Sequence, residues 1–357
     1  MKNFSKFLLL PFGLLYGVVT YLRNKFFDFG ILNQRRFNVP IINVGNLSVG
    51  GTGKTPHVEY LINLLHPQFK IATLSRGYGR KTKGFIEVKE NNKAIEVGDE
   101  PLQIKKKFNA LNVFVGENRV NATKRILELI PELQVLILDD AFQHRYIEPS
   151  INIMLTTYDN LFTKDSILPM GKLREWKSGA QRADAIIVTK TPKIFSLLER
   201  RIITQEIKPQ PHQQVFFSYL SYGDLVPLKQ QATKQVFGNE YFFSRNYACI
   251  LVTGIANPEN LKTYLEERLE SVKHLNFKDH YQFSKADLKF IKEHFETFNK
   301  QNKIIITTEK DAVRLSSPEF EEDLKGMPIF YLPIKVAFHG NDKNLFDEYI
   351  LNYVGRN

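Results

Sequence analysis

A glycine-rich bend within residues 41–56, IINVGNLSVGGTGKTP, constrains the fold of this chain more than any other feature. It follows a short apolar run and precedes Lys54 and Thr55, where a helix is expected to start. Glycines permit backbone conformations that aim several N–H groups at a triphosphate, and the helix adds the positive end of its dipole. Lys54 is expected to reach the β- and γ-phosphates, and the Thr55 hydroxyl to bind Mg²⁺. The predicted phosphate-binding residues are Ser48, Val49, Gly50, Gly51, Thr52, Gly53, Lys54 and Thr55.

The pattern departs from the usual phosphate-binding sequence at one position, where Ser48 replaces the first glycine. A glycine-rich turn that binds nothing is therefore the alternative interpretation. We favour phosphate binding because strand, loop and helix follow one another in the order that the mechanism requires. Pro56 agrees with this placement, since a proline in the first helical turn loses no hydrogen bond.

Beyond the bend, short apolar runs alternate with helical patterns, which predicts a P-loop NTPase-like α/β fold with a mostly parallel sheet and helices on both faces. A polar stretch at 208–214 weakens the pattern, and a second set of strand-like runs begins at 248. The sequence leaves open whether the last helix packs back on the first domain. The predicted organisation is an N-terminal segment at 1–36, a nucleotide-binding kinase domain at 37–222, a smaller α/β domain at 223–340 and a terminal helix at 341–357.

Residues 7–22, FLLLPFGLLYGVVTYL, carry no charged side chain and have basic residues on both sides. As a helix this run would measure about 24 Å, which is short of the ~30 Å hydrocarbon core of a bilayer. A signal peptide is disfavoured because the first alanine in the chain is Ala72, so no A-x-A-like cleavage site follows. We expect residues 1–36 to lie in the bilayer interface; a buried helix that caps the first domain is the alternative.

The run VLILDDAFQHR carries a second chemical signal. Four apolar residues end in Asp139 and Asp140, as in a buried strand whose carboxylates emerge at the edge where open α/β sheets bind ligands. Paired carboxylates there can hold Mg²⁺ opposite Thr55. A simple turn is the alternative. The glycine-rich bend upstream favours the metal, because an NTPase needs a carboxylate at this place.

Other polar residues carry weaker signals by themselves. Arg76 and Arg80 follow a strand-like run and are candidates for phosphate binding. Asp99 in VGDEP could accept a proton from a hydroxyl, although Asp before Glu-Pro is more typical of a helix N-cap. His280 has no neighbours at metal-ligand spacing, which favours a structural role. Residues 309–311 indicate the start of a helix, with acidic side chains near its dipole.

Nine short motifs occur in the order and approximate spacing of the tetraacyldisaccharide 4'-kinases, a family of the lipid A pathway, and the chain resembles that family from its N-terminal segment to about Val313. In that family a hydroxyl residue occupies the position of Ser48, and a proline usually stands where this chain has Lys172. The motifs are GNLSVGGTGKTP, SRGYGRK, VGDEP, GENR, LDDAFQHR, LPMGKLRE, TGIANP, DHY and TTEKDAV.

The resemblance implies transfer of the γ-phosphate of ATP, with Mg²⁺, to the 4'-hydroxyl of an acylated glucosamine disaccharide 1-phosphate. It implies that Asp99 is the general base and that His280, from the second domain, pairs with it. The metal and active-site acid cluster would consist of Asp139, Asp140 and Glu175. Candidates for binding the anionic groups of the substrate or the transferring phosphoryl group are Arg76, Arg80, Arg119 and Arg145.

A formal charge of +11, from 49 Lys and Arg against 38 Asp and Glu, favours anionic partners. With the resemblance, it predicts a lipid A precursor as substrate and an anionic membrane surface at the cytoplasmic face of the bacterial inner membrane, without nucleic acid or an obligate protein partner. A nucleic-acid-binding protein is the first alternative, but no RRM-, KH- or zinc-finger-like pattern is present. A membrane-associated GTPase switch is the second, although residues 189–192, TKTP, lack the Asp of a guanine-binding motif.

Overall fold

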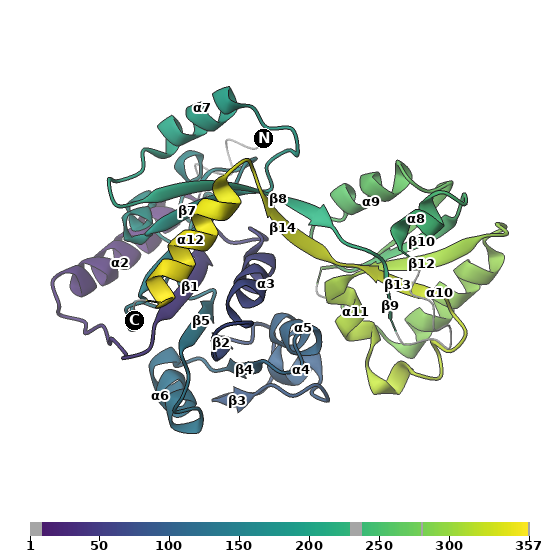
Figure 1. Cartoon of the computed structure of the whole chain (residues 1–357), viewed down its shortest axis with the longest axis horizontal. Coiled ribbons are helices and arrows are strands. Elements are labelled where there is room, and N and C mark those ends of the chain that lie inside the picture. Colours follow the sequence, from purple (N-terminus) through teal and green to yellow (C-terminus); the bar gives the residue numbers. More distant parts are fainter. Residues whose placement is uncertain (1–8, 229–237, 280, 356–357) are drawn as a thin grey trace.

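The computed structural model describes residues 9–228, 238–279 and 281–355, which form two α/β bodies joined by a pair of strands (Figure 1). His280, which was predicted to pair with Asp99, lies outside the described residues. Among the described residues, one sheet has nine strands in the order β14-β8-β7-β6-β1-β5-β2-β4-β3. Its strands are β1 (Ile41–Asn46), β2 (Ile71–Ser75), β3 (Ile86–Glu87), β4 (Asn112–Val115), β5 (Val135–Asp139), β6 (Ile151–Thr157), β7 (Ala185–Thr189), β8 (Gln214–Tyr222) and β14 (Ile334–Phe338).

The second sheet belongs to the smaller body and has the order β11-β10-β12-β13-β9 in the part of the chain that is described. Its strands are β9 (Val226–Pro227), β10 (Ala248–Thr253), β11 (Ser271–Asn276), β12 (Lys303–Thr308) and β13 (Ile329–Leu332). The helices of this body are α8 (Asn239–Phe243), α9 (Glu259–Glu266), α10 (Lys285–Thr297), α11 (Glu309–Leu315) and the short 3₁₀ helix η3 (Pro318–Phe320).

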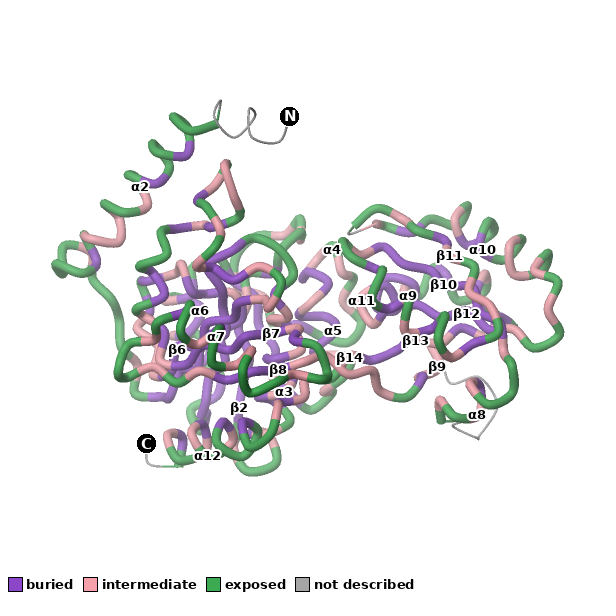
Figure 2. The backbone as a smooth tube through the Cα atoms, turned by 90° about the horizontal axis from the view of Figure 1, so that it is seen from above, coloured by how far each residue is buried: buried purple, intermediate pink, exposed green. Residues whose placement is uncertain are grey.

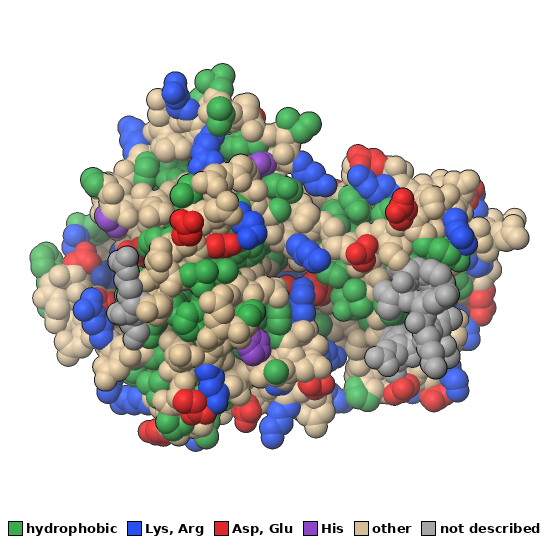
Figure 3. All heavy atoms as spheres, viewed as in Figure 1, with side chains coloured by type: hydrophobic (Ala, Val, Ile, Leu, Met, Phe, Trp, Pro, Cys, Tyr) green, Lys and Arg blue, Asp and Glu red, His purple; other side chains and the backbone are tan. Residues whose placement is uncertain are grey.

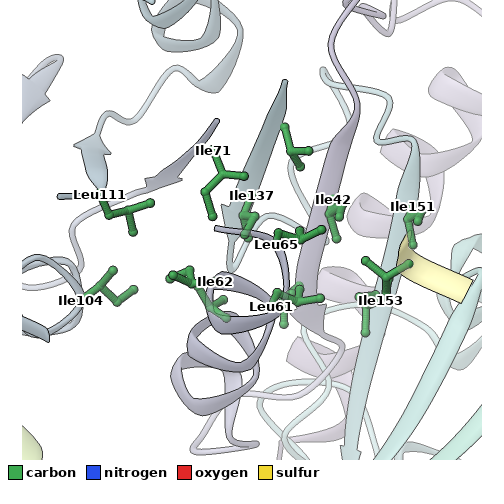
Figure 4. Close-up of a cluster of buried hydrophobic side chains, with 14 of the residues drawn as sticks. Ile42, Leu61, Ile62, Leu65, Ile71, Ile104, Leu111, Ile137, Ile151 and Ile153 are labelled. Carbon is green, nitrogen blue, oxygen red and sulfur yellow. The ribbon is translucent and has the colours of Figure 1, made fainter. Parts of the chain in front are cut away.

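Helices cover both faces of the nine-stranded sheet, as the sequence predicted. They are α2 (Leu10–Asp28), α3 (Lys54–Leu65), α4 (Ala94–Val97), α5 (Asp99–Lys107), α6 (Arg119–Leu129), α7 (Leu197–Ile207) and α12 (Asp342–Gly355), with the 3₁₀ helices η1 (Phe162–Lys164) and η2 (Lys177–Arg182). On one face α3, α5 and α12 pack on the central strands, in a core that includes Leu61, Ile62 and Ile42 (Figure 4). On the other face α6 and α7 form two separate apolar clusters.

Central strand β1 explains why this sheet is parallel and buried. All six of its residues are buried, and it pairs in parallel with β5 on one side and β6 on the other. In this register Val44 lies opposite Asp139. A strand that is apolar on both sides needs helices on both faces, which the helical runs between the strands provide. The carboxyl ends of β1 and β5 therefore meet at one edge of the sheet.

The end of the chain returns to the first body earlier than the predicted boundary at 340. Strand β14 pairs antiparallel with β8, with Phe338 opposite Ser218, so it belongs to the nine-stranded sheet. Helix α12 follows and buries Phe346 and Ile350 in the same core as α3. The last helix thus packs on the first domain, which the sequence had left open. The second body is consequently an insertion between β8 and β14.

Helix α2 lies at the edge of the molecule with most of its residues exposed, so the alternative of a buried capping helix does not describe it (Figure 2). Two of its glycines lie directly against side chains of the body: a Cβ on Gly13 would lie 2.8 Å from Met170, and one on Gly17 2.6 Å from Trp176. None of the described helices has an apolar stretch long enough to cross a membrane. The exposed large apolar side chains of the helix are Leu10, Phe12, Leu14, Leu15, Tyr16, Val18, Val19, Tyr21, Leu22 and Phe26.

Replacing Gly17 with Val is expected to lift α2 from the body of the protein, because the added side chain overlaps the indole of Trp176. Overpacking of this kind costs about 1–3 kcal/mol. Trp176 is the only tryptophan in the chain, and its Nε1 donates to the Gly17 carbonyl at 2.7 Å. The fluorescence emission of Gly17→Val should therefore shift to longer wavelength. Val18→Ala, at an exposed position of the same helix, is the control, and an unchanged emission in Gly17→Val would contradict the packing described.

Candidate active site

The glycine-rich loop joins β1 to α3 in a conformation that needs glycine at two positions. Gly50 and Gly53 have φ angles of 112° and 90°, which side chains rarely permit. Lys54 is the first residue of α3, and Thr55 follows with 4% of its surface exposed. The N-terminal N–H groups of α3 and the side chains of both residues therefore share one end of the helix, as anion binding requires.

Three segments hold this loop in place. The Thr189 hydroxyl at the end of β7 donates to the Thr52 carbonyl at 2.8 Å, and the Asn46 amide donates to the Thr52 hydroxyl at 2.9 Å. The third segment is the LPMGKLRE motif, in which the Lys172 carbonyl accepts from the Val49 N–H at 2.7 Å. Lys172 also donates its own N–H to Asp165 at 3.2 Å, a bond that a proline at this position could not make.

The two carboxylates predicted at the end of β5 lie beside Lys54. Asp140 adopts a positive φ of 53°, and its Oδ2 is 3.7 Å from Lys54 Nζ. The guanidinium of Arg174 donates to both carboxylate oxygens of Asp140, at 2.9 and 3.2 Å. Non-glycine residues in this backbone region are strained, and such strain is held where the surroundings fix one conformation. The ion pairs and the turn together aim Asp140 towards the phosphate-binding loop.

Asp139 is almost completely buried, with 2% of its surface exposed, and its Oδ1 has no hydrogen-bond partner. Burial, together with the neighbouring charges of Glu100 and Asp140, raises its pKa to about 7 against the opposing effect of Lys54. A buried carboxylate without a matching cation is costly. Mg²⁺ fits this place, because the cation would relieve the repulsion between the two carboxylates.

Mg²⁺ in nucleotide sites takes few protein ligands and completes its shell with phosphate oxygens and water. Thr55, Asp139 and Asp140 are the residues that suit it here. Within residues 9–228, 238–279 and 281–355, no group of three or more His, Cys, Asp or Glu side chains is arranged to hold a metal ion by itself.

Glu175, which was predicted to belong to the acid cluster, is buried and hydrogen-bonded to three groups of the protein. It accepts from Asn24 of α2 at 2.6 Å, from Arg182 at 2.8 Å and from Gln143 at 3.1 Å. Gln143 in turn accepts from Arg174, the partner of Asp140. These contacts favour a supporting role for Glu175, through Gln143 and Arg174, over direct contact with a metal.

The four candidate arginines divide into two pairs. Arg119 is buried and lies close enough to Asp139 for the two charges to interact, and burial lowers its pKa to about 10. Arg76 is exposed near Arg119. By contrast, Arg80 pairs with Glu117 at 2.5 Å, and Arg145 pairs with Asp28 of α2 at 2.9 Å. The structure thus brings Arg119 to the acid pair with Arg76 near it, while Arg80 and Arg145 hold other segments together.

Asp99 is the first residue of α5, and Gly98 precedes it in the N-cap position without a side-chain cap. The N-cap interpretation of Asp99 is therefore wrong. Its carboxylate, 8% exposed as a residue, accepts from Arg314 Nη2 at 2.5 Å, and Arg314 belongs to α11 of the second body. Both bodies thus contribute to the surroundings of Asp99. On the face drawn in Figure 3, basic and acidic side chains lie along the junction between the two bodies.

Sequence reasoning missed Lys190 and Arg314. Lys190 follows β7 with a positive φ of 57°, and its Nζ would lie 4.0 Å from a Cβ on Gly51 of the phosphate-binding loop. Burial lowers the pKa of Lys190. Its position at the end of a strand-like run, DAIIVTK, was the available signal. Arg314 carried no signal, because its proximity to Asp99 arises only when the two bodies come together.

The chain is similar to known proteins over nearly its whole length. A family model described as tetraacyldisaccharide-1-P 4'-kinase matches residues 5–354. The tetraacyldisaccharide 4'-kinase of Flavobacterium psychrophilum is 45% identical over 354 residues, covering 99% of this chain and 98% of the relative. That of Bacteroides fragilis is 44% identical over 351 residues, covering 98% and 93%. The fold is similar to LpxK from Aquifex aeolicus solved in complex with ATP, with a TM-score of 0.73 and 27% identity over 98% of this chain and 99% of that one.

Asp139→Asn is expected to stabilise the protein in the absence of nucleotide and Mg²⁺, and to do so more at high pH. A carboxyl group whose pKa is raised from 3.8 to about 7 on folding contributes stability below pH 4 that is lost as the pH rises through 7. Asparagine resembles the protonated carboxyl and does not lose this contribution. The melting temperature of the variant should therefore exceed that of the wild type by more at pH 8 than at pH 5.

Asp140→Asn is the comparison for this measurement, because it removes the ion pairs with Lys54 and Arg174. It should give no such gain at pH 8. An equal gain at both pH values in Asp139→Asn would contradict the unpaired, buried state of this carboxylate.

Proposed function

The chain belongs to the tetraacyldisaccharide 4'-kinase family, and we propose that it transfers the γ-phosphate of ATP to the 4'-hydroxyl of a tetraacyldisaccharide 1-phosphate in lipid A biosynthesis. The observation that carries the proposal is the meeting of a glycine-rich loop and an acid pair at one edge of the sheet, with Lys54 3.7 Å from Asp140. This is the arrangement that phosphoryl transfer from a nucleotide requires. The ATP complex of the Aquifex aeolicus relative supports the choice of nucleotide.

In this proposal the loop from Ser48 to Thr55 binds the triphosphate. Backbone N–H groups at the start of α3 and the Lys54 ammonium contact the β- and γ-phosphates. Thr55, Asp139 and Asp140 would hold Mg²⁺, which when bound neutralises charge on the phosphate oxygens. Glu175 supports this group through Gln143 and Arg174. Phosphoryl transfer depends mainly on positioning and charge neutralisation, so these contacts account for most of the rate.

Positive charge around the acid pair suits the acceptor and the transferring group. Arg119 lies beside Asp139, and Arg76 lies near Arg119 on the exposed side. In this proposal the two arginines bind anionic groups of the substrate or the phosphoryl group during its transfer. Arg80 and Arg145, the other two candidates, contribute indirectly, because their guanidinium groups pair with Glu117 and Asp28.

The acceptor hydroxyl needs a group that orients it and takes its proton. We assign this role to Asp99, which is buried beside the junction of the two bodies, and His280 is its proposed partner on the basis of the family resemblance. A base built from two bodies is complete only when the bodies lie together. Contact between the bodies would also keep water away from the transferring phosphoryl group.

The acceptor is a lipid, so the enzyme must work at a membrane surface. We propose that α2 lies in the interface of the cytoplasmic leaflet of the bacterial inner membrane, because its exposed apolar side chains match that environment. The excess of basic over acidic residues supports attraction to anionic lipids. Helix α2 is also attached to the site: the Tyr16 hydroxyl donates to the Arg174 carbonyl at 2.8 Å. A helix held in this way would bring the site to the lipid headgroups.

Lys54→Ala is expected to lower the transfer rate about 10²- to 10³-fold, because it removes one fixed positive charge from the γ-phosphate. The assay follows γ-labelled phosphate from ATP, with Mg²⁺, to a detergent-dispersed disaccharide 1-phosphate, and looks for a bis-phosphorylated lipid. Lys89→Ala changes an exposed lysine outside the site and should be fully active. Near-normal transfer by a folded Lys54→Ala variant would contradict the role of Lys54 in binding the γ-phosphate. Strict dependence on GTP would favour a GTPase instead.

Leu15→Asp combined with Val19→Asp is expected to weaken binding to anionic vesicles and to slow phosphorylation of lipid presented in a bilayer. These side chains are 65% and 58% exposed on α2, and charged groups there oppose insertion into the interface. Transfer to detergent-dispersed substrate should be unaffected. Ile194→Asp with Leu197→Asp is the matched control, since those apolar side chains are 94% and 85% exposed away from α2. Equal losses in both double variants would show that net charge, not α2, determines membrane affinity.

A further inference from the structure

Helices α5 and α11 face each other across the junction of the two bodies (Figures 1 and 2). Among the described residues, three ion pairs join them in opposite order along the two helices, as expected for an antiparallel contact. The pairs are Lys107 with Glu309 at 2.7 Å, Glu100 with Lys310 at 2.5 Å and Asp99 with Arg314 at 2.5 Å. The last of the three involves the proposed base of the reaction.

Contacts within the second body fix the side chain of Arg314 independently of Asp99. Its side chain is 2% exposed, and Nη1 donates to Asp311 Oδ1 at 2.9 Å and to the Gly254 carbonyl at 3.2 Å. Asp311 is itself held, because its Oδ2 accepts from the Gly254 N–H at 2.9 Å and from the Thr308 hydroxyl at 2.7 Å. The Nη1 side of the guanidinium is thus held by Asp311 and Gly254, and Nη2 points towards Asp99 of the first body.

We propose that Arg314 is a positioning residue for the transfer reaction: from the second body, it orients the Asp99 carboxylate and keeps it ionised. This inference rests on the proposed function and on the role of Asp99 within it. The contact is Nη2 to Oδ2 at 2.5 Å, between side chains that are 2% and 9% exposed. Water and salt screen such a buried pair weakly, so its geometry is held more firmly than that of a surface ion pair.

An arginine suits this role although it lowers the basicity of its partner. Phosphoryl transfer passes through a loose transition state, in which orienting the acceptor hydroxyl matters more than a strong base. A misplacement of about 1 Å in such a group can cost about 100-fold in rate. The fork of the guanidinium binds Asp311 and Asp99 at once, which the single ammonium of a lysine cannot do with the same geometry. The charge of Asp99 also raises the pKa of Arg314, which keeps the pair ionised.

Other charged groups act on this pair and remain when Arg314 is changed. Lys310 and Asp311 lie close enough to interact with Asp99, and Asp279 interacts with Arg314. Glu100 follows Asp99 in the chain and pairs with Lys310. Because these groups stay in place, any change in the acid limb of the pH profile on replacing Arg314 reports the loss of one cation beside Asp99.

The test compares Arg314→Met, Arg314→Lys and Asp99→Asn with the wild-type chain in the labelled-ATP assay. Arg314→Met should lower kcat about 10- to 100-fold, as for groups that orient a reacting side chain, with little change in the KM for ATP. The acid limb of kcat/KM should move to higher pH, since a carboxylate without its cation protonates more easily. Arg314→Lys, which keeps the charge but loses the fork, should recover the position of the acid limb and only part of kcat.

The double variant decides whether Arg314 acts through Asp99. If it does, Arg314→Met should cost little in the Asp99→Asn background, because the carboxylate to be positioned is gone. Fully multiplicative losses would overturn the proposal. If Asp99→Asn itself retains full kcat, the assignment of the base has failed, and the kinase activity is still judged separately by Lys54→Ala.

Glu309→Gln is the matched control for domain contact. It removes an ion pair of the same interface, while Lys107 keeps its bond to Glu59 at 2.6 Å. This variant should retain wild-type kcat and pH profile. If it loses as much rate as Arg314→Met, the ion pairs only hold the bodies together and the positioning role is wrong. If Arg314→Met does not fold, Arg314→Lys serves as the test. A lower kcat with an unchanged acid limb supports the positioning role, and an unchanged kcat contradicts it.

Discussion

The complete burial of β1 between β5 and β6 is the constraint on which the rest of the structure depends. A parallel strand buried on both faces has to carry its ligand at its carboxyl edge, because its middle is covered by helices. The register places Asp139 level with Val44, only a few residues before the glycine-rich loop. Hydrogen bonds from Asn46 and Thr189, and one to the Lys172 carbonyl, then hold the loop in place. Packing of apolar residues thus fixes the position of groups that contact a polyanion.

The protein's own cations neutralise only part of the negative charge of the carboxylates at this edge of the sheet. Burial raises the pKa of Asp139, and the nearby carboxylates of Asp140 and Glu100 add to this effect, which Lys54 and Lys310 oppose only in part. Arg174 pairs with Asp140, and Lys310 pairs with Glu100. Under the proposed function, a nucleotide with a divalent cation would add positive charge where the carboxylates meet and negative charge where Lys54 and the loop lie. The residues that destabilise the protein without its ligand would then stabilise it with the ligand bound.

The sequence predicted the features that depend on neighbouring residues and missed those that depend on distant ones. Strand runs, the loop and the Asp139–Asp140 turn are local patterns, and they appear where expected. The pairing of β14 with β8 was missed, because a short strand carries no sign of its partner. The contacts of Arg145 and Glu175 with α2 were missed for a similar reason: a polar side chain does not reveal whether it faces a ligand or another segment. Arg314 was missed as a partner of Asp99, because nothing in its local sequence shows that it faces the other body.

The return of the chain through β14 and α12 has a consequence for synthesis on the ribosome. The nine-stranded sheet lacks its edge strand, and its core lacks Phe346 and Ile350, until the last residues have emerged. The inserted body, by contrast, has all its described strands by residue 332 and can fold while the first body is still incomplete. The apolar α2 emerges first of all the described elements and has to wait until Met170 and Trp176 have been made before they can cover its two glycines. A nascent chain therefore exposes the apolar side chains of α2 to water early, when only a nearby bilayer or a chaperone can cover them.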